Sequence, residues 1–314
     1  MTGTVTGPLQ EAARLLGPRV RTGVPIGPLT TYRVGGPAAL FLEARDEEDL
    51  ALAKQAVTAT GVPVLVVGRG SNLLVADRGF PGLALVLGDQ FATIDLRPEQ
   101  RVRAGAAVQL PVLARRTAAA GLTGLEWAVG VPGSVGGAVR MNAGGHGADT
   151  AATLRRFCFV DLRSEGPDGE ADSTRLSYSY RSSTVAPHHV VVWAEFQLAP
   201  GDPEASQAAI ADIVRWRREH QPGGQNAGSV FTNPPDDAAG RLIEAAGLKG
   251  LRRGTAQVSD KHANFIQADD GGSADDVWAL VQEVRRRVEA ETGVLLRSEV
   301  KTVGFPEPST LSGG

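Results

Sequence analysis

The eighteen residues from Gly130 to Gly147, GVPGSVGGAVRMNAGGHG, constrain the fold more than any other part of this chain. They include seven glycines, one proline and hardly any bulky side chain. A hydrophobic core gains little from such a stretch, because glycine loses much chain entropy on folding and buries no side chain. It is tolerated where backbone approaches a large flat group, or a phosphate that accepts hydrogen bonds from N–H groups. We therefore expect this segment to lie against a bound cofactor.

The bulk composition excludes several other classes of protein. The chain has 314 residues, of which 42% are hydrophobic and 21% charged, as in ordinary soluble proteins. Its formal net charge of -3 argues against nucleic-acid binding, and no apolar run approaches the roughly 20 residues of a membrane span. One cysteine, Cys158, permits neither an internal disulfide nor a multi-cysteine zinc site, and we predict no metal site. Without a signal peptide, the predicted location is cytoplasmic.

Helix and strand signals alternate along the chain and predict an α+β fold. Strands are expected over 39–44, 62–67 and 101–108, with helices from Asp46 to Gly61 and from Leu110 to Gly121. Further helices are expected after GDPE (201–204) and between Ser273, where Asp276 suggests a capping box, and Gly293. Residues 1–20 and 306–314 are expected to be flexible. The boundaries are placed near residues 90 and 200, which gives parts over 21–90, 91–200 and 201–298 and a closing strand over 299–305.

The glycine loops do not fit a Rossmann site. GRGSN (68–72) follows an expected strand, but Leu73, Leu74 and Val75 predict another strand where a dinucleotide fingerprint needs a helix. No clear strand precedes the glycines from Gly130 onward, and we expect them to form a wall rather than a helix-opening turn. Two loops, near 70 and near 130–137, could together hold a flavin dinucleotide. The alternative is that they are simple turns.

Three polar residues are candidates for chemistry, although spacing alone does not connect them. Arg181 lies in YSYRSS, Ser229 in NAGSVFTNP, and Glu299 in the alternating strand pattern LLRSEVKTVG. Taken singly, each has an ordinary explanation: a solvated surface charge, a turn serine and a solvent-facing strand position.

An ordered set of motifs gives these residues a common context. The set is TTYRVGG (30–36), GRGSNLL (68–74), GVPGSVGGA (130–138), YR (180–181), GSVFTNP (228–234), SDKHANF (259–265) and RSEVKTVG (297–304). From about residue 22 to 304 the chain thereby resembles the UDP-N-acetylenolpyruvoylglucosamine reductase (UDP-N-acetylmuramate dehydrogenase) family. Any one of these motifs alone would be weak, whereas the ordered set is specific.

The resemblance implies a cytoplasmic FAD oxidoreductase of bacterial peptidoglycan synthesis, and hence of cell-wall biogenesis, cell shape and division. NADPH would reduce the flavin, which would then reduce the enolpyruvyl ether of UDP-N-acetylglucosamine enolpyruvate to UDP-N-acetylmuramate. The implied fold has two FAD-binding parts of the vanillyl-alcohol oxidase type, over 21–90 and 91–200, and a C-terminal substrate-binding domain over 201–298.

The resemblance also implies which residues form the site. Arg181 would stabilise the substrate carboxylate and the developing enolate, Glu299 would support it as an acid, and Ser229 would donate a proton to carbon. The cofactor-binding set is Tyr32, Arg33, Gly68, Gly70, Ser71, Asn72, Leu73, Gly130, Pro132, Gly133, Ser134, Gly136, Gly137 and Ala138. The substrate-binding set is Tyr180, Asn233, His262 and Asn264.

The chain departs from one form of the family. Only 47 residues separate Arg181 from Ser229, and no tyrosine follows Tyr180. The sequence therefore resembles the shorter form, which lacks an inserted tyrosine loop over the substrate. Arg215, Arg217 and Arg218 could contact a phosphate of UDP or NADPH, although a solvated helix face is the simpler interpretation.

Other functions and partners are weighed on the same residues. A flavin-dependent sugar or alcohol oxidase on the same scaffold is the alternative function, and a nucleotide-binding module without catalysis is a further one. We expect a monomer with no nucleic-acid or membrane partner.

Overall fold

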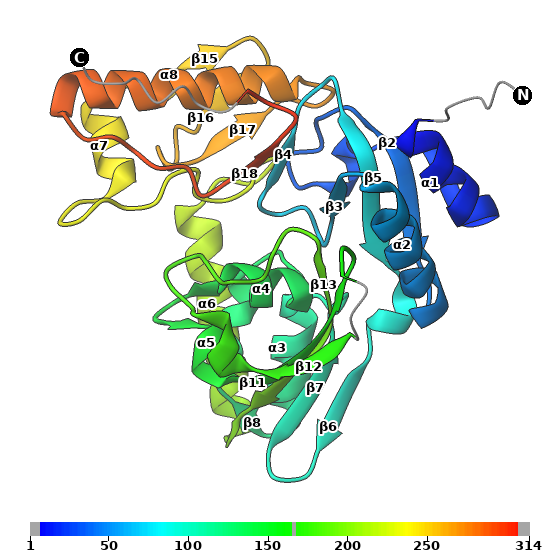
Figure 1. Cartoon of the computed structure of the whole chain (residues 1–314). Coiled ribbons are helices and arrows are strands. Elements are labelled where there is room, and N and C mark those ends of the chain that lie inside the picture. The colour runs from blue at the N-terminus through cyan, green and yellow to red at the C-terminus, as the bar shows by residue number, and fades with distance from the viewer. Residues whose placement is uncertain (1–6, 165–167, 307–314) are drawn as a thin grey trace, which may run out of the picture. The chain divides into compact units, whose positions relative to one another are not determined.

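The computed structural model describes residues 7–164 and 168–306, which pack into two units (Figure 1). Each unit is assembled from separate stretches of chain. Unit 1 draws on residues 1–24, 39–71 and 81–223, and unit 2 on 25–38, 72–80 and 224–314. The sequence-based boundaries near 90 and 200 both lie inside unit 1, and the division into the parts predicted from the sequence stays a prediction.

One layer of unit 1 is a four-stranded sheet in the order β1-β2-β5-β3, with two helices packed together beside it. The strands and helices are β1 (Val20–Pro25), β2 (Pro37–Ala44), β3 (Val64–Val66), β5 (Phe80–Leu87), α1 (Pro8–Leu16) and α2 (Glu47–Thr60). Asp46 caps α2 by accepting the Asp49 N–H, and Gly61 ends it in the left-handed conformation, as predicted. Within the start that was expected to be flexible, residues 8–16 instead form α1, which buries Ala12 and Leu16. Residues 1–6 and 307–314, on which the rest of the flexibility prediction falls, lie outside the described residues.

A second layer of unit 1 is an antiparallel sheet in the order β12-β11-β13-β7-β6. Its core contains Val102, Phe157 and Phe196 together with side chains from helices α3, α4 and α6. The elements are β6 (Ile94–Arg97), β7 (Arg101–Gly105), α3 (Leu110–Ala119), α4 (Val135–Met141), α5 (Thr150–Thr153), β11 (Leu154–Asp161), β12 (Gly169–Asp172), β13 (His189–Gln197) and α6 (Pro203–His220). Two short ladders complete the layer, β8 (Leu122–Thr123) with β14 (Ala199–Pro200) and β9 (Gly144–Gly145) with β10 (Ala148–Asp149).

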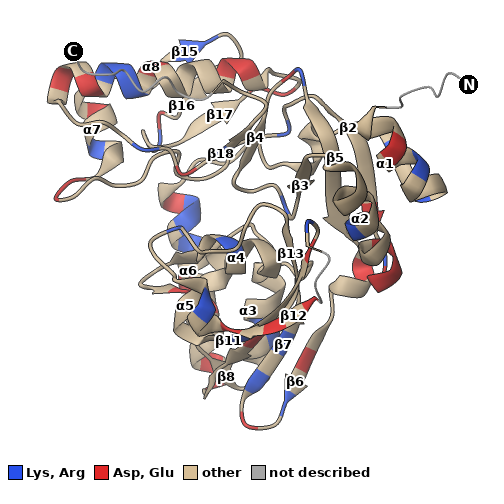
Figure 2. Ribbon diagram, viewed as in Figure 1, with Lys and Arg blue, Asp and Glu red and all other residues tan. Residues whose placement is uncertain are grey.

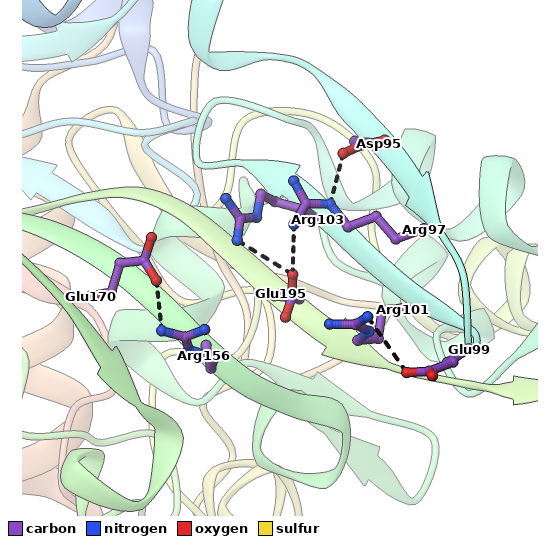
Figure 3. Close-up of polar contacts among 8 residues, drawn as sticks. All are labelled: Asp95, Arg97, Glu99, Arg101, Arg103, Arg156, Glu170 and Glu195. Atoms are coloured by element: carbon purple, nitrogen blue, oxygen red, sulfur yellow. Dashed lines mark hydrogen bonds and ion pairs between the residues drawn. The ribbon is translucent and has the colours of Figure 1, made fainter.

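The antiparallel sheet of unit 1 carries charged residues, which Figure 2 shows on β6 and β7. The buried carboxylate of Glu195 accepts hydrogen bonds from Arg97 (3.1 Å) and Arg103 (3.4 Å), as Figure 3 shows. The Arg103 guanidinium also lies 3.6 Å from the centre of the Trp193 ring. A buried carboxylate is costly unless it is paired, so the two arginines allow Glu195 to occupy a central strand.

Unit 2 is built around a three-stranded sheet in the order β15-β16-β17, against which α8 packs. Its elements are β4 (Leu73–Val75), α7 (Ala239–Ala245), β15 (Arg252–Arg253), β16 (Ala256–Val258), β17 (Ile266–Ala268), α8 (Ala274–Thr292) and β18 (Lys301–Val303). The Ser273 side chain caps α8 by accepting the Asp276 N–H, and Gly293 ends it, as predicted. β4 and β18 pair in parallel, which brings the chain after GRGSN beside the chain after Glu299.

Two local expectations are corrected. The glycine run does open a helix, because Gly136 and Gly137 lie in the first turn of α4. Glu299 does not lie within a strand, because β18 begins only at Lys301. No helix in the described parts of the chain combines the length and apolar character needed to cross a bilayer.

Asp77, which follows β4, fixes this strand to α8. Its carboxylate accepts hydrogen bonds from the Ser273 hydroxyl (2.5 Å) and from the N–H groups of Ala274 (3.0 Å) and Asp275 (3.2 Å). It therefore satisfies N–H groups at the start of α8, although it lies about 200 positions earlier in the sequence.

We predict that Asp77→Ala lowers the free energy of unfolding by about 0.5–2 kcal/mol, the usual cost of removing a helix cap. Urea unfolding of the purified protein measures this. Glu291→Ala, an exposed change in the last turn of α8, is the control and should cost less. Equal stability of the Asp77 variant and the parent protein would show that the contact is not stabilising.

Candidate functional site

The two glycine loops of unit 1 lie against each other, as expected for a shared cofactor cradle. A Cβ atom added at Gly68 would lie 2.6 Å from the Ser134 hydroxyl oxygen, and one added at Gly133 would lie 3.5 Å from that of Ser71. At Gly136 an added Cβ would lie 3.0 Å from Ala106. At position 68, therefore, only glycine allows the chain to lie this close to Ser134 without a shift of the serine. The strand predicted after GRGSN is confirmed as β4.

The first loop has the donors that a pyrophosphate requires. Gly70 has a φ of +57°, which favours glycine. Within the described residues, no protein acceptor takes the N–H groups of Arg69, Gly70 or Ser71. By contrast, the N–H groups of Val135 and Gly136 already donate to backbone carbonyls. The N–H groups of the loop around Gly70, beside close-packed glycines, fit the phosphates of FAD.

The other predicted cofactor residues fall in different surroundings. Gly130 lies close to the Arg217 side chain, Pro132 and Gly137 are exposed, and Ala138 is buried in α4. In unit 2, Leu73 is buried in β4, and Arg33 is exposed with a φ of +55°. Tyr32 is wholly buried in the unit 2 core; burial raises the pKa of its phenol, and its hydroxyl has no partner among the described residues. Their roles toward FAD remain predictions.

Arg181 occupies a tight turn in unit 1. Ser179 and Ser182 exchange backbone hydrogen bonds across Tyr180 and Arg181, and Arg181 has a φ of +53°. A positive φ is unusual for a residue with a Cβ atom, so the surroundings must hold it in place. The guanidinium does so by donating to the carbonyl oxygens of Gly144 (2.7 Å) and Asn142 (3.4 Å). It also lies 5.0 Å from the centre of the Tyr180 ring.

The same turn closes the C-terminal end of α4. The Tyr178 hydroxyl donates to the Val139 carbonyl (2.9 Å), and the Ser183 hydroxyl donates to that of Arg140 (2.6 Å). The Asn142 side chain, at the left-handed C-cap, donates to the Ser179 carbonyl (3.3 Å). Tyr178, Ser183 and Asn142 were not among the site residues predicted from the sequence. Of these, Asn142 could have been found, because asparagine is favoured at the left-handed position that ends a helix.

Ser229 and Glu299 lie together in unit 2. Residues 230–232 pair antiparallel with 297–299: the Glu299 N–H donates to the Val230 carbonyl (2.8 Å), and Phe231 bridges to Ser298. Ser229 is therefore a direct chain neighbour of the residue that pairs with Glu299. Both side chains are only partly buried, so a ligand can reach them.

Two asparagine side chains hold these paired segments. The buried Asn264 accepts the Phe231 N–H (2.9 Å) through Oδ1 and donates to the Phe231 carbonyl (2.8 Å) through Nδ2. Asn72 donates its side-chain amide to the Glu299 carbonyl (3.1 Å) and accepts the Lys301 N–H at its own carbonyl (3.0 Å). Asn72 and Asn264 therefore fix the backbone on either side of the serine and the glutamate.

The remaining substrate candidates are partly engaged by the protein. Asn233 accepts the N–H of Ala239, at the start of α7, through Oδ1 (3.0 Å). His262 accepts the Asn264 N–H at Nδ1 (3.2 Å), and burial lowers the pKa of its imidazole below the ordinary value. Protonation of His262 therefore opposes folding, and its contribution to stability is present above a pH of about 6.5 and lost as the pH falls below it.

The arginines of α6 are mostly committed to neighbouring side chains. Arg215 pairs with Asp212 (2.5 Å), and Arg217 donates through Nε to Gln221 (2.8 Å). Burial lowers the pKa of Arg217, which is unusual for an arginine on a solvated helix face. The contact of Arg217 with Gly130 ties this helix to the glycine-rich segment.

Comparison with known proteins agrees with this organisation. Residues 38–170 match the FAD binding domain family, and residues 220–303 match the C-terminal domain of UDP-N-acetylenolpyruvoylglucosamine reductase. The UDP-N-acetylenolpyruvoylglucosamine reductase of Synechococcus sp. (strain WH7803) is 44% identical over 98% of both chains. That of Heliobacterium modesticaldum is 44% identical over 92% of both.

Solved structures give the same result. The crystal structure of UDP-N-acetylenolpyruvylglucosamine reductase from Thermus caldophilus superposes with a TM-score of 0.79 at 37% identity, covering 91% of this chain and 99% of that one. The Physcomitrella patens protein BBE-like 1 superposes with a TM-score of 0.54 at 13% identity, over 91% and 89% of the two chains, which shows a shared fold alone. The resemblance proposed from the motifs is confirmed: the chain belongs to the UDP-N-acetylenolpyruvoylglucosamine reductase family.

Proposed function

We propose that this chain is an FAD-dependent oxidoreductase that uses NADPH to reduce UDP-N-acetylglucosamine enolpyruvate to UDP-N-acetylmuramate, a step in peptidoglycan precursor synthesis. One observation carries the proposal beyond family membership. The Arg181 guanidinium is bound to carbonyls of the glycine-rich segment inside the part of the chain that matches the FAD binding domain family. An anion-binding side chain is thus fixed to a proposed wall of the cofactor site.

FAD, when bound, supplies the hydride that the enolpyruvyl CH2 group accepts. Hydride addition places negative charge on the carbon that bears the substrate carboxylate, and this charge delocalises as an enolate. Two of the Arg181 guanidinium N–H donors are used by the Asn142 and Gly144 carbonyls, which orient the planar group. A guanidinium presents its N–H donors in a planar fork, which is the geometry that binds a carboxylate or an enolate oxygen.

Ser229 is proposed as the proton donor to the same carbon. A serine hydroxyl is a weak acid, but an enolate carbon is a strong enough base when the two atoms are held in position. The backbone pairing of residues 230–232 with 297–299 supports that rigidity, because it sets Glu299 opposite Val230, the chain neighbour of the serine. Glu299 then acts as the supporting acid.

The other predicted substrate residues receive different proposed roles. Tyr180 is 65% exposed and stacks beside Arg181, so it is available to a ligand. Both ends of the Asn264 amide are used by Phe231, so we propose that Asn264 positions Ser229 and does not touch substrate. Asn233 and His262 keep a proposed substrate contact through their remaining polar atoms. We also propose a cytoplasmic monomer.

The purified protein tests the proposed function directly. It should be yellow, NADPH should bleach its flavin absorption bands, and the enolpyruvyl sugar nucleotide should restore them faster than oxygen does. A colourless protein that FAD cannot reconstitute would exclude the function. Fast reoxidation by oxygen with no response to the sugar nucleotide would instead favour the alternative sugar or alcohol oxidase.

Ser229→Ala should separate the two halves of the reaction. We expect bleaching by NADPH at the parent rate, while reoxidation by the enolpyruvyl substrate slows by about 10²–10⁴-fold, the usual contribution of a general acid. Stopped-flow absorption measures both steps. Ser298→Ala removes a hydroxyl from the facing segment and is the matched control, with near-parent rates expected. Unchanged substrate-driven reoxidation in Ser229→Ala would remove the serine from the mechanism.

Arg181→Lys keeps the positive charge but loses the fork of donors. A lysine ammonium cannot bind two backbone carbonyls and a carboxylate in the same plane, so substrate-driven reoxidation should slow by about 10²-fold or more. Arg175→Lys, on the exposed 3₁₀ turn nearby, is the control. A lysine variant as fast as the parent protein would show that charge alone suffices and that the fork has no role.

A further inference from the structure

Two adjacent histidines and an aspartate meet at one end of the β11–β13 pair, away from the residues assigned above. Asp161 ends β11 and pairs directly with His189, the first residue of β13. His188 precedes the strand, and its carbonyl accepts the Leu162 N–H (3.2 Å). The strand pairing therefore fixes the backbone of all three side chains before any ligand binds.

The donor atoms of these side chains converge. Nε2 of His188 lies 3.5 Å from Oδ1 of Asp161, and Nε2 of His189 lies 3.7 Å from Oδ2. One donor atom from each residue lies within 4.8 Å of the other two. Ligand atoms around a tetrahedral zinc ion are about 3.3–3.4 Å apart, given bonds of about 2.0–2.1 Å. The two imidazole–carboxylate distances exceed that spacing by a few tenths of an ångström, and side-chain rotation would have to draw in any donor pair that lies as far apart as 4.8 Å.

We propose that Asp161, His188 and His189 form a binding site for a borderline divalent metal ion, with Zn²⁺ as the ion it favours. Two imidazoles and one carboxylate suit zinc better than magnesium or calcium, which prefer oxygen ligands alone. The three side chains are 22–25% exposed, so a water molecule can complete the fourth position.

Binding has a specific consequence for the His189 ring. Its Nδ1 accepts the Ala186 N–H (3.3 Å), which places the ring proton on Nε2, facing Asp161. A metal at Nε2 requires the neutral ring to carry its proton on Nδ1 instead. Capture of the ion therefore moves that proton from one ring nitrogen to the other, with no net release from His189, and breaks the Ala186 hydrogen bond.

The charges around the site are mixed. Asp161 attracts a cation, whereas Arg140 and the neighbouring His188 disfavour positive charge on His189. The lost Ala186 hydrogen bond and the Arg140 charge both weaken metal binding.

The site would join the two ends of the stretch that carries Arg181. That stretch leaves β11 after Asp161 and returns to β13 at His189. A metal ion would hold the two ends together in addition to the strand pairing. The proposal does not depend on the reaction assigned to the protein, and its test does not use enzyme activity.

Titration calorimetry of the untagged holoprotein with ZnCl₂ at pH 7.5 is the first measurement. One ion should bind per chain, and His188→Asn and Asp161→Asn should each weaken binding tenfold or more. His220→Asn changes an exposed histidine on α6 and should bind zinc as the parent protein does. No saturable binding by the parent, or unchanged affinity in both site variants, would overturn the proposal.

Hydrogen exchange distinguishes this site from adventitious zinc binding at the surface. Zinc should speed exchange of the Ala186 amide, because His189 no longer accepts its hydrogen bond, and should slow exchange of the Leu162 amide on the clamped strand end. His188→Asn should abolish both changes while keeping the metal-free exchange pattern, which shows that it is folded. Zinc binding without the Ala186 response would contradict the proposed use of His189.

Discussion

The carbonyl groups at the C-terminal end of α4 determine where Arg181 lies. A helix leaves its last carbonyls without partners, and in α4 side chains from residues 178–183 supply the donors. Two further carbonyls, of Asn142 and Gly144, accept the Arg181 guanidinium itself. The strained φ of Arg181 is tolerated because these contacts hold the turn from both sides. The glycine-rich segment thus has two roles, as a proposed cofactor wall and as the anchor of the proposed anion-binding residue.

In unit 2, asparagine side chains position the backbone of the proposed site. Asn264 binds both polar groups of the Phe231 peptide, and Asn72 binds the Glu299 carbonyl. Both residues belong to motifs that identify the family, yet their amides contact backbone. This explains why such a motif can be essential to a site without touching a ligand. Ser229 and Glu299, which lie beside them and are only partly buried, are the residues that we propose to carry the chemistry.

The sequence predicted those features whose physical cause is local. Asp46 and Gly61 bound α2, and Ser273 and Gly293 bound α8, because caps act within one helical turn. The sequence did not predict α4, since consecutive glycines are poor helix formers and tertiary contacts override that preference here. Residues 72–80 pack with the C-terminal part of the chain through contacts between residues far apart in the sequence, such as that of Asp77 with α8, and such contacts could not be predicted from local patterns. The ordered motifs identified the catalytic candidates. The residues that position them, such as Tyr178, were recognised only from their hydrogen bonds in the structure.

The absence of a tyrosine after Tyr180 has a structural counterpart. The 47 residues between Arg181 and Ser229 include β13, β14 and α6, and β13 pairs with both β11 and β7 in the sheet of unit 1. A strand with two hydrogen-bonded neighbours cannot leave the sheet without breaking both ladders, so β13 itself cannot supply a mobile cover. Tyr180 itself is 65% exposed, lies in the turn beside Arg181 and stacks on its guanidinium. The chain thus carries an exposed aromatic ring one position before the arginine, on the turn that the α4 contacts hold in place.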